Sequence, residues 1–272
     1  MTPGRANLDV LRGRLQGYDG LVVAYSGGAD SAFLATVAHQ VLRDRMVAVT
    51  AVSPSLAAAE RADAAAFAAE RGFRQIEVET DELERAAYQV NDANRCFWCK
   101  DALMDAVGPI ADAERATVVL GVNVDDLGDH RPGQRAAADR GASFPLVDAG
   151  YTKAMIRHES EVLGLRTWDK PAAACLASRL PYGTPVTLGV LREVEQAEAS
   201  LAALGFRALR VRHYRDLARI EVPLDDLPEV VARRVEVVAA VRSAGYRYVT
   251  LDLEGLRSGN LNAALGPRAD RA

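Results

Sequence analysis

The stretch YSGGADS at residues 25–31 follows the apolar run LVVA and precedes the apolar run AFLA. This order predicts a buried strand, a tight loop and the start of a helix. Two adjacent glycines let the backbone bend sharply and approach a ligand without a Cβ in the way. The first free N–H groups of the helix then form an anion site at the positive end of its dipole.

The polar residues of this loop indicate which anion it binds. Ser26 and Ser31 add hydroxyl donors, and Asp30 adds a carboxylate. A carboxylate beside a phosphate is repulsive unless a cation such as Mg²⁺ lies between them. The loop, with Gly27 and Gly28, is therefore predicted to bind ATP together with Mg²⁺ held by Asp30. The alternative is a glycine-rich turn that binds nothing, and the chain holds no Walker A motif.

The composition is that of a globular protein without a basic surface. The chain has 272 residues, 49% of them hydrophobic, with a formal net charge of −4 and a pI of about 5.7. Such a charge does not favour binding to nucleic acid. No apolar run reaches the roughly 20 residues of a membrane span, and the first residues lack the apolar core of a signal peptide. We therefore expect a cytoplasmic protein with no membrane or nucleic-acid partner.

Strands and helices alternate in the first part of the chain. Short apolar runs predict strands, and segments rich in helix-forming residues between them predict helices. The strands are expected at Leu21–Ala24, Met46–Val52, Gln75–Val78 and Val118–Val122, and the helices at Ser31–Arg43, Ala57–Arg71 and Lys100–Ala113. This order predicts an α/β fold with a doubly wound parallel sheet, in which ligands bind at the carboxyl ends of the strands.

The pattern changes after about residue 165. Residues 169–187 carry three prolines without clear periodicity and predict a long ordered loop. Beyond it we expect a helix at Leu188–Leu204, strands at Ala208–Tyr214 and Ala218–Val222, a helix at Leu224–Ala244 and a strand at Tyr246–Leu251. The chain is therefore expected to form two domains, a nucleotide-binding domain at residues 1–165 and a smaller C-terminal α+β domain at residues 166–272.

Three cysteines point to a second kind of chemistry. Cys96 and Cys99 form a C-x-x-C motif, and Cys175 stands alone in the segment KPAAACLASR. An odd number of cysteines in a reducing compartment argues for metal or catalytic roles rather than for disulfides. The motif alone leaves open a redox pair, part of a zinc site, iron–sulfur ligands or buried thiols. Three thiolates without a fourth ligand suit a [4Fe–4S] cluster with one open iron.

Further polar residues are candidates for binding the nucleotide. Asn123 and Asp125 follow a predicted strand at the same sheet edge as the glycine loop. Asp125 and Asp126 are equally well explained as helix caps. Lys100 and Lys153 are candidates for neutralising a phosphate. For Lys153 we favour instead a solvated lysine on the surface.

Four segments resemble the LarE-type ATP-dependent sulfur transferases. They are VAYSGGADSAFL, NRCFWCK, KPAAACLASRLPYG and DLEGLRSGNLN, and a fifth, LRVRHYRDLARIEV, agrees with them. The SGGxDS loop is shared across the superfamily of PP-loop (pyrophosphatase loop) ATP pyrophosphatases, whereas the ACLASR-x-PYGT run is far more specific. The resemblance extends from about residue 8 to residue 262 and implies the PP-loop fold.

The resemblance also implies a reaction. Family members act on pyridinium-3,5-biscarboxylic acid mononucleotide, on the way to the nickel-pincer nucleotide cofactor of lactate racemase. Adenylation of a substrate carboxylate by Mg-ATP releases pyrophosphate, and sulfur held on the protein then attacks the carbonyl. In many members a lone cysteine at the position of Cys175 gives up its own sulfur. The cysteines here resemble instead a subset in which Cys96, Cys99 and Cys175 hold a [4Fe–4S] cluster, which we expect, with sacrifice of Cys175 as the alternative.

For the substrate the resemblance implies a set of cationic and polar side chains: Ser178, Arg179, Arg210, Arg212 and Glu221. Arg210 and Arg212 alternate along one predicted strand and so share a face. Glu221 is a candidate to bind metal or to orient an arginine. The expected partners are a small-molecule nucleotide, further copies of this chain and a downstream protein that inserts nickel.

Other functions stay open at this point. A PP-loop tRNA thiolase shares the loop and the cysteines but needs a cationic surface for its substrate. An amide-forming enzyme of the NAD or GMP synthetase kind shares the ATP loop and has no need of three cysteines. A non-catalytic iron–sulfur carrier or nucleotide sensor is the third alternative.

Overall fold

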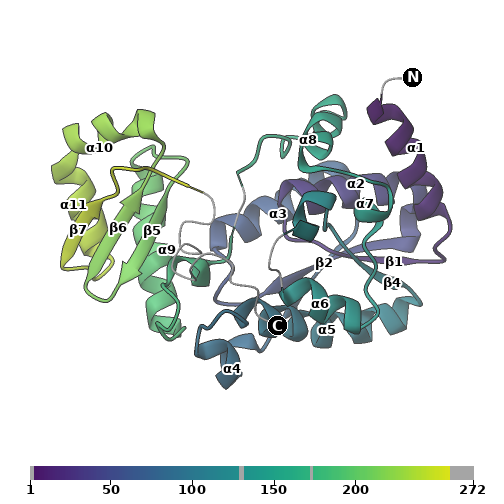
Figure 1. Ribbon diagram of the computed structural model, residues 1–272, viewed down its shortest axis with the longest axis horizontal. Helices are drawn as coiled ribbons and strands as arrows, with labels where there is room; N and C mark the ends of the chain where they lie inside the picture. The colour runs from purple at the N-terminus through teal and green to yellow at the C-terminus, as the bar shows by residue number, and fades with distance from the viewer. Residues whose placement is uncertain (1–2, 129–131, 172–173, 258–272) are drawn as a thin grey trace. The chain divides into compact units, whose positions relative to one another are not determined.

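The computed structural model describes residues 3–128, 132–171 and 174–257. The chain forms two compact units, one of residues 1–85 and 94–173 and the other of residues 86–93 and 174–272 (Figure 1). Residues 172–173 of the cysteine segment and the final SGNLN of the family match lie outside the described residues.

The first unit is built on a four-stranded parallel sheet in the order β3-β2-β1-β4 (Figure 1). Its strands are β1 (Leu21–Ala24), β2 (Met46–Val52), β3 (Gln75–Glu79) and β4 (Thr117–Leu120). Because β1 lies between β2 and β4, the loop that follows it stands where the strand order reverses. Open α/β sheets bind their ligands at this point, outside the carboxyl ends of the strands.

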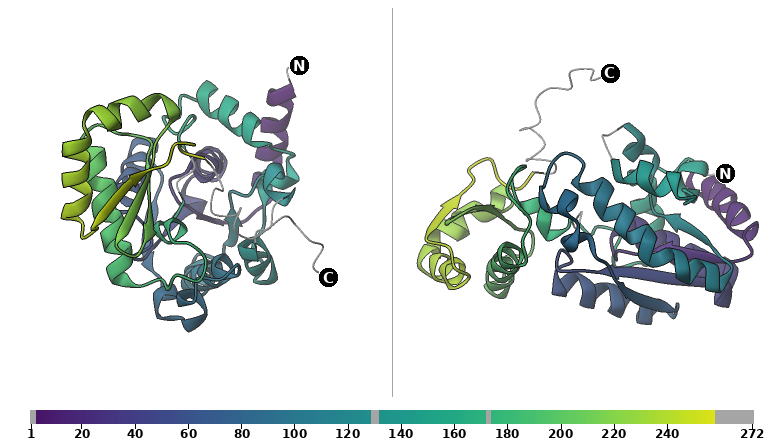
Figure 2. Two further views of the ribbon diagram at one scale, coloured as in Figure 1. Left: turned by 60° about the vertical axis from the view of Figure 1, so that its left-hand side comes forward. Right: turned by 90° about the horizontal axis from the view of Figure 1, so that it is seen from below.

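Helices cover both faces of this sheet (Figure 2). One side carries α1 (Pro3–Gln16), α2 (Ala29–Leu42), α3 (Ala58–Arg71), α7 (Pro145–Asp148) and α8 (Lys153–Val162). The other side carries α5 (Arg95–Glu114) and α6 (Pro132–Asp139). The expected doubly wound α/β fold is therefore confirmed.

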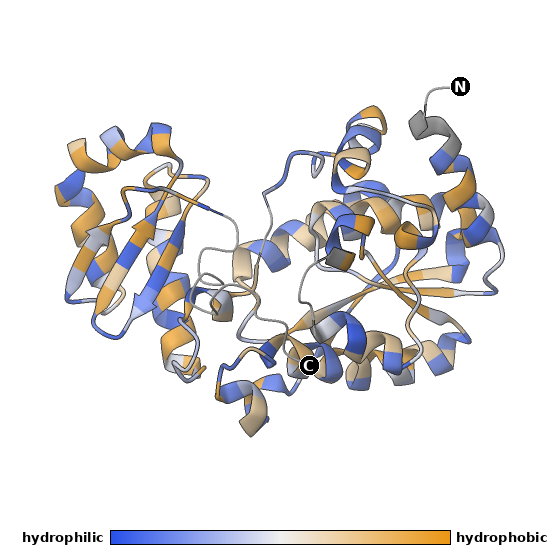
Figure 3. Cartoon of the chain, in the orientation of Figure 1, coloured by the Kyte–Doolittle hydropathy of each residue, from blue (hydrophilic) through white to orange (hydrophobic). Residues whose placement is uncertain are grey.

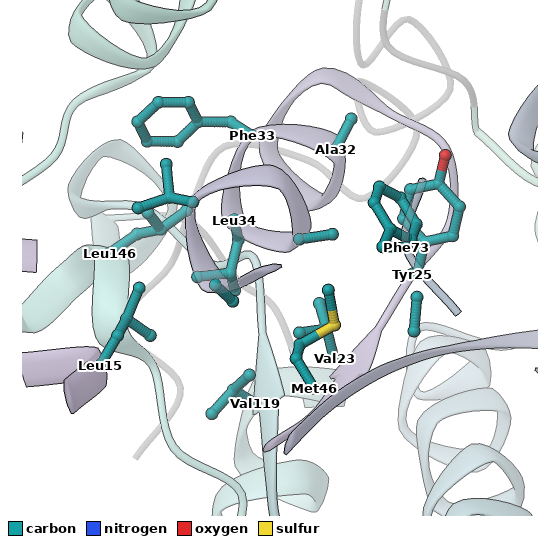
Figure 4. Packing of buried hydrophobic residues seen from close by; sticks show 14 of the residues in the cluster. Leu15, Val23, Tyr25, Ala32, Phe33, Leu34, Met46, Phe73, Val119 and Leu146 are labelled. Atoms are coloured by element: carbon teal, nitrogen blue, oxygen red, sulfur yellow. The ribbon is translucent and has the colours of Figure 1, made fainter. Parts of the chain in front are cut away.

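Alternate residues of β1 serve two separate cores. Leu21 and Val23 belong to the cluster with α2, whereas Val22 belongs to the cluster with α5. In Figure 4, Val23 lies near Met46 and Val119 of the neighbouring strands. The strands of this sheet are mostly hydrophobic along their length (Figure 3). A strand buried on both faces has to be apolar throughout, and this is why the run LVVA predicted a strand.

The second unit is a small α+β structure, as expected. It contains α4 (Ala86–Gln89), α9 (Leu188–Ala203), β5 (Arg210–Tyr214), β6 (Leu217–Glu221), α10 (Leu227–Ala232), α11 (Arg234–Ser243) and β7 (Tyr248–Leu251). The sheet has the order β5-β6-β7, with β5 antiparallel and β7 parallel to β6. Its core gathers apolar residues of α9, α11 and all three strands. Across the described parts of both units, no helix combines the length with the hydropathy that a membrane span requires.

Several elements differ from the sequence-based expectation. Helix α5 begins at Arg95 rather than at Lys100, which places the C-x-x-C motif inside its first turns. The helix expected over 224–244 is broken at Arg233, which separates α10 from α11. Helix α8 was not among the expected helices; it buries Ile156 in the core together with the polar residues Glu159 and Ser160.

Gly121, directly after β4, lets the start of α2 approach the sheet closely. A Cβ on Gly121 would lie 2.9 Å from the Ser31 backbone nitrogen and 3.1 Å from the Asp30 carbonyl carbon. We expect Gly121→Ala to lower the free energy of unfolding by about 1–3 kcal/mol, because backbone on one side or the other has to move. Gly13→Ala in α1, where nothing lies within 4 Å, is the control and is expected to be neutral or stabilising. Equal losses for both variants in urea denaturation would contradict the prediction.

Candidate functional site

Hydrogen bonds within the glycine loop hold it against the first turn of α2. Ser31 Oγ donates to the Gly28 carbonyl at 3.1 Å and accepts from the Ser26 amide at 3.2 Å. Gly28 is the N-cap residue and supplies no side-chain cap to the helix. The first N–H groups of α2 are therefore not satisfied by a capping side chain, as an anion site requires.

Gly27 is the residue that allows the loop to pack against α3. Its φ is +73°, and a Cβ there would lie 2.7 Å from the Cβ of Ala64. The Tyr25 hydroxyl donates to the Ala64 carbonyl at 3.1 Å, which ties the loop to the same turn of α3. Burial raises the pKa of Tyr25, so this phenol stays protonated as a donor. No residue other than glycine fits at position 27.

Asp30 is paired with Lys153, which corrects one expectation. Lys153 Nζ lies 2.5 Å from Asp30 Oδ2, so Lys153 is not the solvated surface lysine that we favoured. Burial raises the pKa of Asp30, against the opposing effect of the Lys153 hydrogen bond. The second carboxylate oxygen, Oδ1, is buried and has no hydrogen-bond partner among the residues that the structure describes. An unpartnered carboxylate oxygen beside an anion site fits the predicted Mg²⁺ ligand.

The polar residues after β4 form a network that leads to the same lysine. Asn123 Oδ1 accepts from the Asp125 amide at 3.0 Å, and the Asn123 amide donates to Asp126 Oδ2 at 3.1 Å. Asp125 Oδ2 accepts from the Lys153 amide at 2.8 Å, at the first residue of α8. The carboxylates of Asp125 and Asp126 thus bind backbone N–H groups, and Asp125 helps to place Lys153 beside Asp30. Contacts of Asn123 and Asp125 with a nucleotide stay a prediction.

The C-x-x-C motif presents its thiols near the start of α5. Cys96 is exposed and Cys99 is partly exposed, and among the described residues neither takes part in a disulfide. Three residues apart on a helix, they share one face. Within the described residues, no three His, Cys, Asp or Glu side chains are gathered as a metal site. Lys100 is partly exposed and has no salt-bridge partner in the part of the chain that the structure describes.

A pocket that sequence reasoning did not predict lies at the carboxyl ends of strands β2 and β3 in the first unit. It has a volume of about 360 Å³ and is lined by residues that follow or end β2 and β3: Val52, Ser53, Pro54, Glu79 and Thr80. β2 is the direct neighbour of β1, whose carboxyl end carries the glycine loop. The volume of this pocket falls within the range of small-molecule sites.

In the second unit, Arg179 fixes the segment that carries Cys175. Its guanidinium donates to both carboxylate oxygens of Glu198 on α9, at 2.9 and 3.0 Å. It also donates to the Ala174 carbonyl at 2.6 Å and to Ser178 Oγ at 3.1 Å. Cys175 itself is free and partly exposed. Sequence reasoning missed Glu198, because a glutamate on a helix face carries no mark of its buried partner.

A cluster of charged residues stands beside this segment on β5 and β6. Arg212 donates to the Ser178 carbonyl at 2.8 Å and to Glu221 Oε2 at 2.8 Å. Glu221 is fully buried and also accepts from Arg219 at 3.0 Å. Glu221 thus contacts two arginines, and the roles expected of it, metal binding or orienting an arginine for the substrate, stay predictions.

Three cations come close together here. Burial, together with repulsion from Arg179 and Arg212, lowers the pKa of Arg210. Arg210 and Arg212 share a face of β5, as their spacing predicted. Such a concentration of positive charge suits a phosphate or carboxylate ligand.

Comparisons with known proteins agree with this architecture. The NAD synthase family model matches residues 6–104, the part that contains the glycine loop. Pyridinium-3,5-bisthiocarboxylic acid mononucleotide synthase of Lactiplantibacillus plantarum is 35% identical over 247 residues, which cover 90% of each chain. The chain belongs to the LarE-type family of ATP-dependent sulfur transferases.

Two further relatives of this chain have names that state no activity. An uncharacterized protein of Synechocystis sp. is 44% identical over 263 residues, 96% of this chain and 98% of its own length. An uncharacterized protein of Methanocaldococcus jannaschii is 26% identical over 239 residues, 88% of this chain and 91% of its own length. The resemblance seen in the sequence segments is therefore confirmed at the level of the family.

Replacing Asp30 is expected to stabilise the metal-free protein while removing its activity. Because the pKa of Asp30 is raised in the folded state, its ionised form weakens folding as the pH rises from about 4. Asp30→Asn should therefore raise the melting temperature at pH 7 without metal, and should flatten the loss of stability between pH 4 and 7. Formation of AMP with Mg-ATP should fall about 100-fold or more. A metal-free variant less stable than the wild type at pH 7 would contradict this account.

The buried Glu221 is expected to be essential for the stability of the second unit. Glu221→Ala leaves Arg212 and Arg219 without their shared carboxylate, and removing one partner of a buried pair costs about 3–5 kcal/mol. Glu254→Ala removes the carboxylate of an exposed pair with Arg257 and is the control, expected to change little. Chemical denaturation of both variants tests the difference.

Proposed function

We propose that this chain is an ATP-dependent sulfur transferase that converts the carboxylates of pyridinium-3,5-biscarboxylic acid mononucleotide to thiocarboxylates. The observation that carries the proposal is its 35% identity, over 90% of each chain, to the enzyme named for the bisthiocarboxylic product. Two structural features support it: an uncapped helix N-terminus behind a glycine loop in the first unit, and a cluster of arginines beside Cys175 in the second.

The first unit would activate the substrate. A carboxylate oxygen is a poor leaving group, and adenylation replaces it with AMP. The loop residues Ser26, Gly27, Gly28 and Ser31 would bind the phosphates of ATP, with Lys100, Asn123 and Asp125 as further contacts. Mg²⁺ held by Asp30 would neutralise charge on the phosphates. Lys153, paired with Asp30, adds a positive charge at the same place.

The second unit would bind the anionic groups of the substrate. Ser178, Arg179, Arg210, Arg212 and Glu221 are proposed for this role. Their contacts suggest a division of labour. Arg179 and Arg212 are each held by a carboxylate, Glu198 and Glu221 respectively, and so add charge from fixed positions. Arg210 has a pKa lowered by its cationic neighbours, so an anion placed beside it would relieve that repulsion.

Sulfur would be delivered at Cys175, by one of two routes. In the first, the Cys175 sulfur attacks the adenylated carbonyl and AMP leaves; removal of the Cys175 Cα proton then breaks the Cβ–S bond, which releases the thiocarboxylate and leaves dehydroalanine on the protein. In the second, Cys96, Cys99 and Cys175 hold a [4Fe–4S] cluster, which supplies a bound sulfide for transfer. Among the described residues none of the three cysteines forms a disulfide and each is at least partly exposed, which is compatible with either route. We favour the cluster, because the lone-cysteine route has no use for the C-x-x-C motif.

The intact mass of the anaerobically purified protein separates these routes. It is measured before and after reaction with Mg-ATP and the dicarboxylate mononucleotide. A loss of about 34 Da, the mass of H₂S, would show that Cys175 is consumed. An unchanged apoprotein mass, with iron bound and thiolated product formed, would support the cluster. A C96A/C99A variant should then lose transfer, whereas under the sacrificial route it should retain a single turnover.

The same reaction tests the proposed function as a whole. Wild-type protein that releases neither AMP nor thiolated product from this substrate would contradict it. A tRNA shift in a gel that weakens with salt would then favour the thiolase alternative. We further propose that the protein works in the cytoplasm as a homo-oligomer and passes its product to a nickel-inserting protein. Sedimentation analysis tests the oligomer.

A further inference from the structure

Lys170 makes three polar contacts within the first unit, none of them expected from the sequence. Its ammonium group donates to the Gly27 carbonyl at 3.2 Å and to Asp63 Oδ2 at 2.6 Å. It also pairs with Glu60 Oε2 at 2.8 Å. The contacts with Gly27 and Asp63 are hydrogen bonds and use two of the three ammonium protons, whereas the contact with Glu60 is an ion pair. The side chain is only 15% exposed, which makes it a fixed part of the loop's surroundings rather than a surface lysine.

The contact with Gly27 bears on the direction of the next amide. The described peptide bonds contain no cis bond, so the N–H of Gly28 points opposite to the carbonyl of Gly27. The Gly28 nitrogen has one hydrogen-bond contact, to Ser26 Oγ at 3.5 Å, which is too long to satisfy it. While Lys170 holds the Gly27 carbonyl, the Gly28 N–H therefore points away from Lys170 and stays available to a phosphate.

This peptide needs an external restraint. Both residues that it joins are glycines, which move freely between backbone conformations, so the peptide can flip at little cost. A flipped peptide would turn a carbonyl oxygen toward the phosphates in place of an N–H donor. A cationic donor on the carbonyl opposes the flip, because hydrogen bonds with a charged partner are the stronger ones.

Lys170 is itself anchored from two sides. Asp63 and Glu60 on α3 hold its ammonium group, and Arg157 donates to its backbone carbonyl at 3.2 Å. Burial alone would raise the pKa of Asp63, but hydrogen bonds from Lys170 and Arg166 hold it below its ordinary value. The Asp63 carboxylate that holds Lys170 is therefore ionised at neutral pH.

We propose that Lys170 is a positioning residue for adenylation, which holds the Gly27–Gly28 peptide with its N–H toward the phosphates of ATP. The adenylation step in this proposal rests on the proposed function. The binding of Mg-ATP, which tests the proposal, can be measured whether or not that function is correct. Lys170 acts through the loop backbone and is not itself assigned a contact with the nucleotide. Loss of Lys170 should therefore affect ATP and pyrophosphate more than the dicarboxylate mononucleotide.

The test compares Lys170→Met with a control at the same anchor. Arg166 also forms an ion pair with Asp63, and a second one with Glu70. Neither of these ion pairs involves Gly27. Arg166→Met therefore removes a cation from Asp63 and leaves the loop carbonyl held. Equilibrium binding of Mg-ATP and of inorganic pyrophosphate is measured by calorimetry, with melting temperatures as a record of folding. Lys170→Arg, which keeps the charge, serves as the second variant where Lys170→Met folds poorly.

We expect Lys170→Met to raise the dissociation constants of Mg-ATP and pyrophosphate about tenfold or more, as loss of a charged hydrogen bond implies. Lys170→Arg should recover part of this loss. Arg166→Met should lower the melting temperature and leave both constants within about threefold of wild type. Saturating Mg-ATP should not restore the rate of AMP formation in Lys170→Met, because the misplaced donor is lost in the transition state as well.

Two results would overturn the proposal. One is wild-type affinity for Mg-ATP in a folded Lys170→Met variant. The other is an equal loss of affinity in Arg166→Met. That result would show that Lys170 affects binding through its ion pair with Asp63 and not through the Gly27 carbonyl. A wild-type protein that binds Mg-ATP but forms no AMP with the dicarboxylate mononucleotide would instead contradict the proposed function, and the binding constants would still decide the role of Lys170.

Discussion

The first unit depends on a close approach of backbones around the glycine loop. Gly27 faces Ala64 of α3, and Gly121 faces the first turn of α2, each at a distance that a Cβ would not tolerate. The loop is thus packed between a helix and the end of a strand. Such packing fixes the path of the loop, and the Lys170 contact with the Gly27 carbonyl adds a restraint on the direction of the Gly27–Gly28 peptide. Preorganised donors are effective in catalysis because they need no rearrangement during the reaction.

The ion pair beside the glycine loop does not fully compensate the negative charge of Asp30. Asp30 remains costly to ionise even with Lys153 beside it, and one of its oxygens has no partner. A binding site often keeps such unfavourable features, because a ligand or metal relieves them. Lys170 presents the opposite case, because two hydrogen bonds and an ion pair hold its ammonium group and its side chain is only 15% exposed. One lysine is therefore suited to exchange partners and the other to stay in place.

In the second unit, a buried carboxylate, Glu221, and a partly buried one, Glu198, hold arginines that would otherwise repel one another. Glu198 takes both arms of Arg179, and Glu221 joins Arg212 to Arg219. Buried ion pairs of this kind are weak sources of stability, because the desolvation of each charge is costly. Their presence beside Cys175 is better explained by the need to concentrate positive charge where an anionic substrate would lie.

The sequence by itself determined the architecture of the sheet and the position of the loop. A strand buried on both faces must be apolar, and a sharp turn into a helix requires glycine, so LVVA and SGGADS could be recognised without coordinates. Partners far apart in the chain were decided by the tertiary structure alone. Lys153 and Asp30 are 123 residues apart, and Lys170 and Gly27 are 143 apart. A lysine in sequence carries no mark of its partner, because ion pairing depends on which side chains folding brings within a few ångströms.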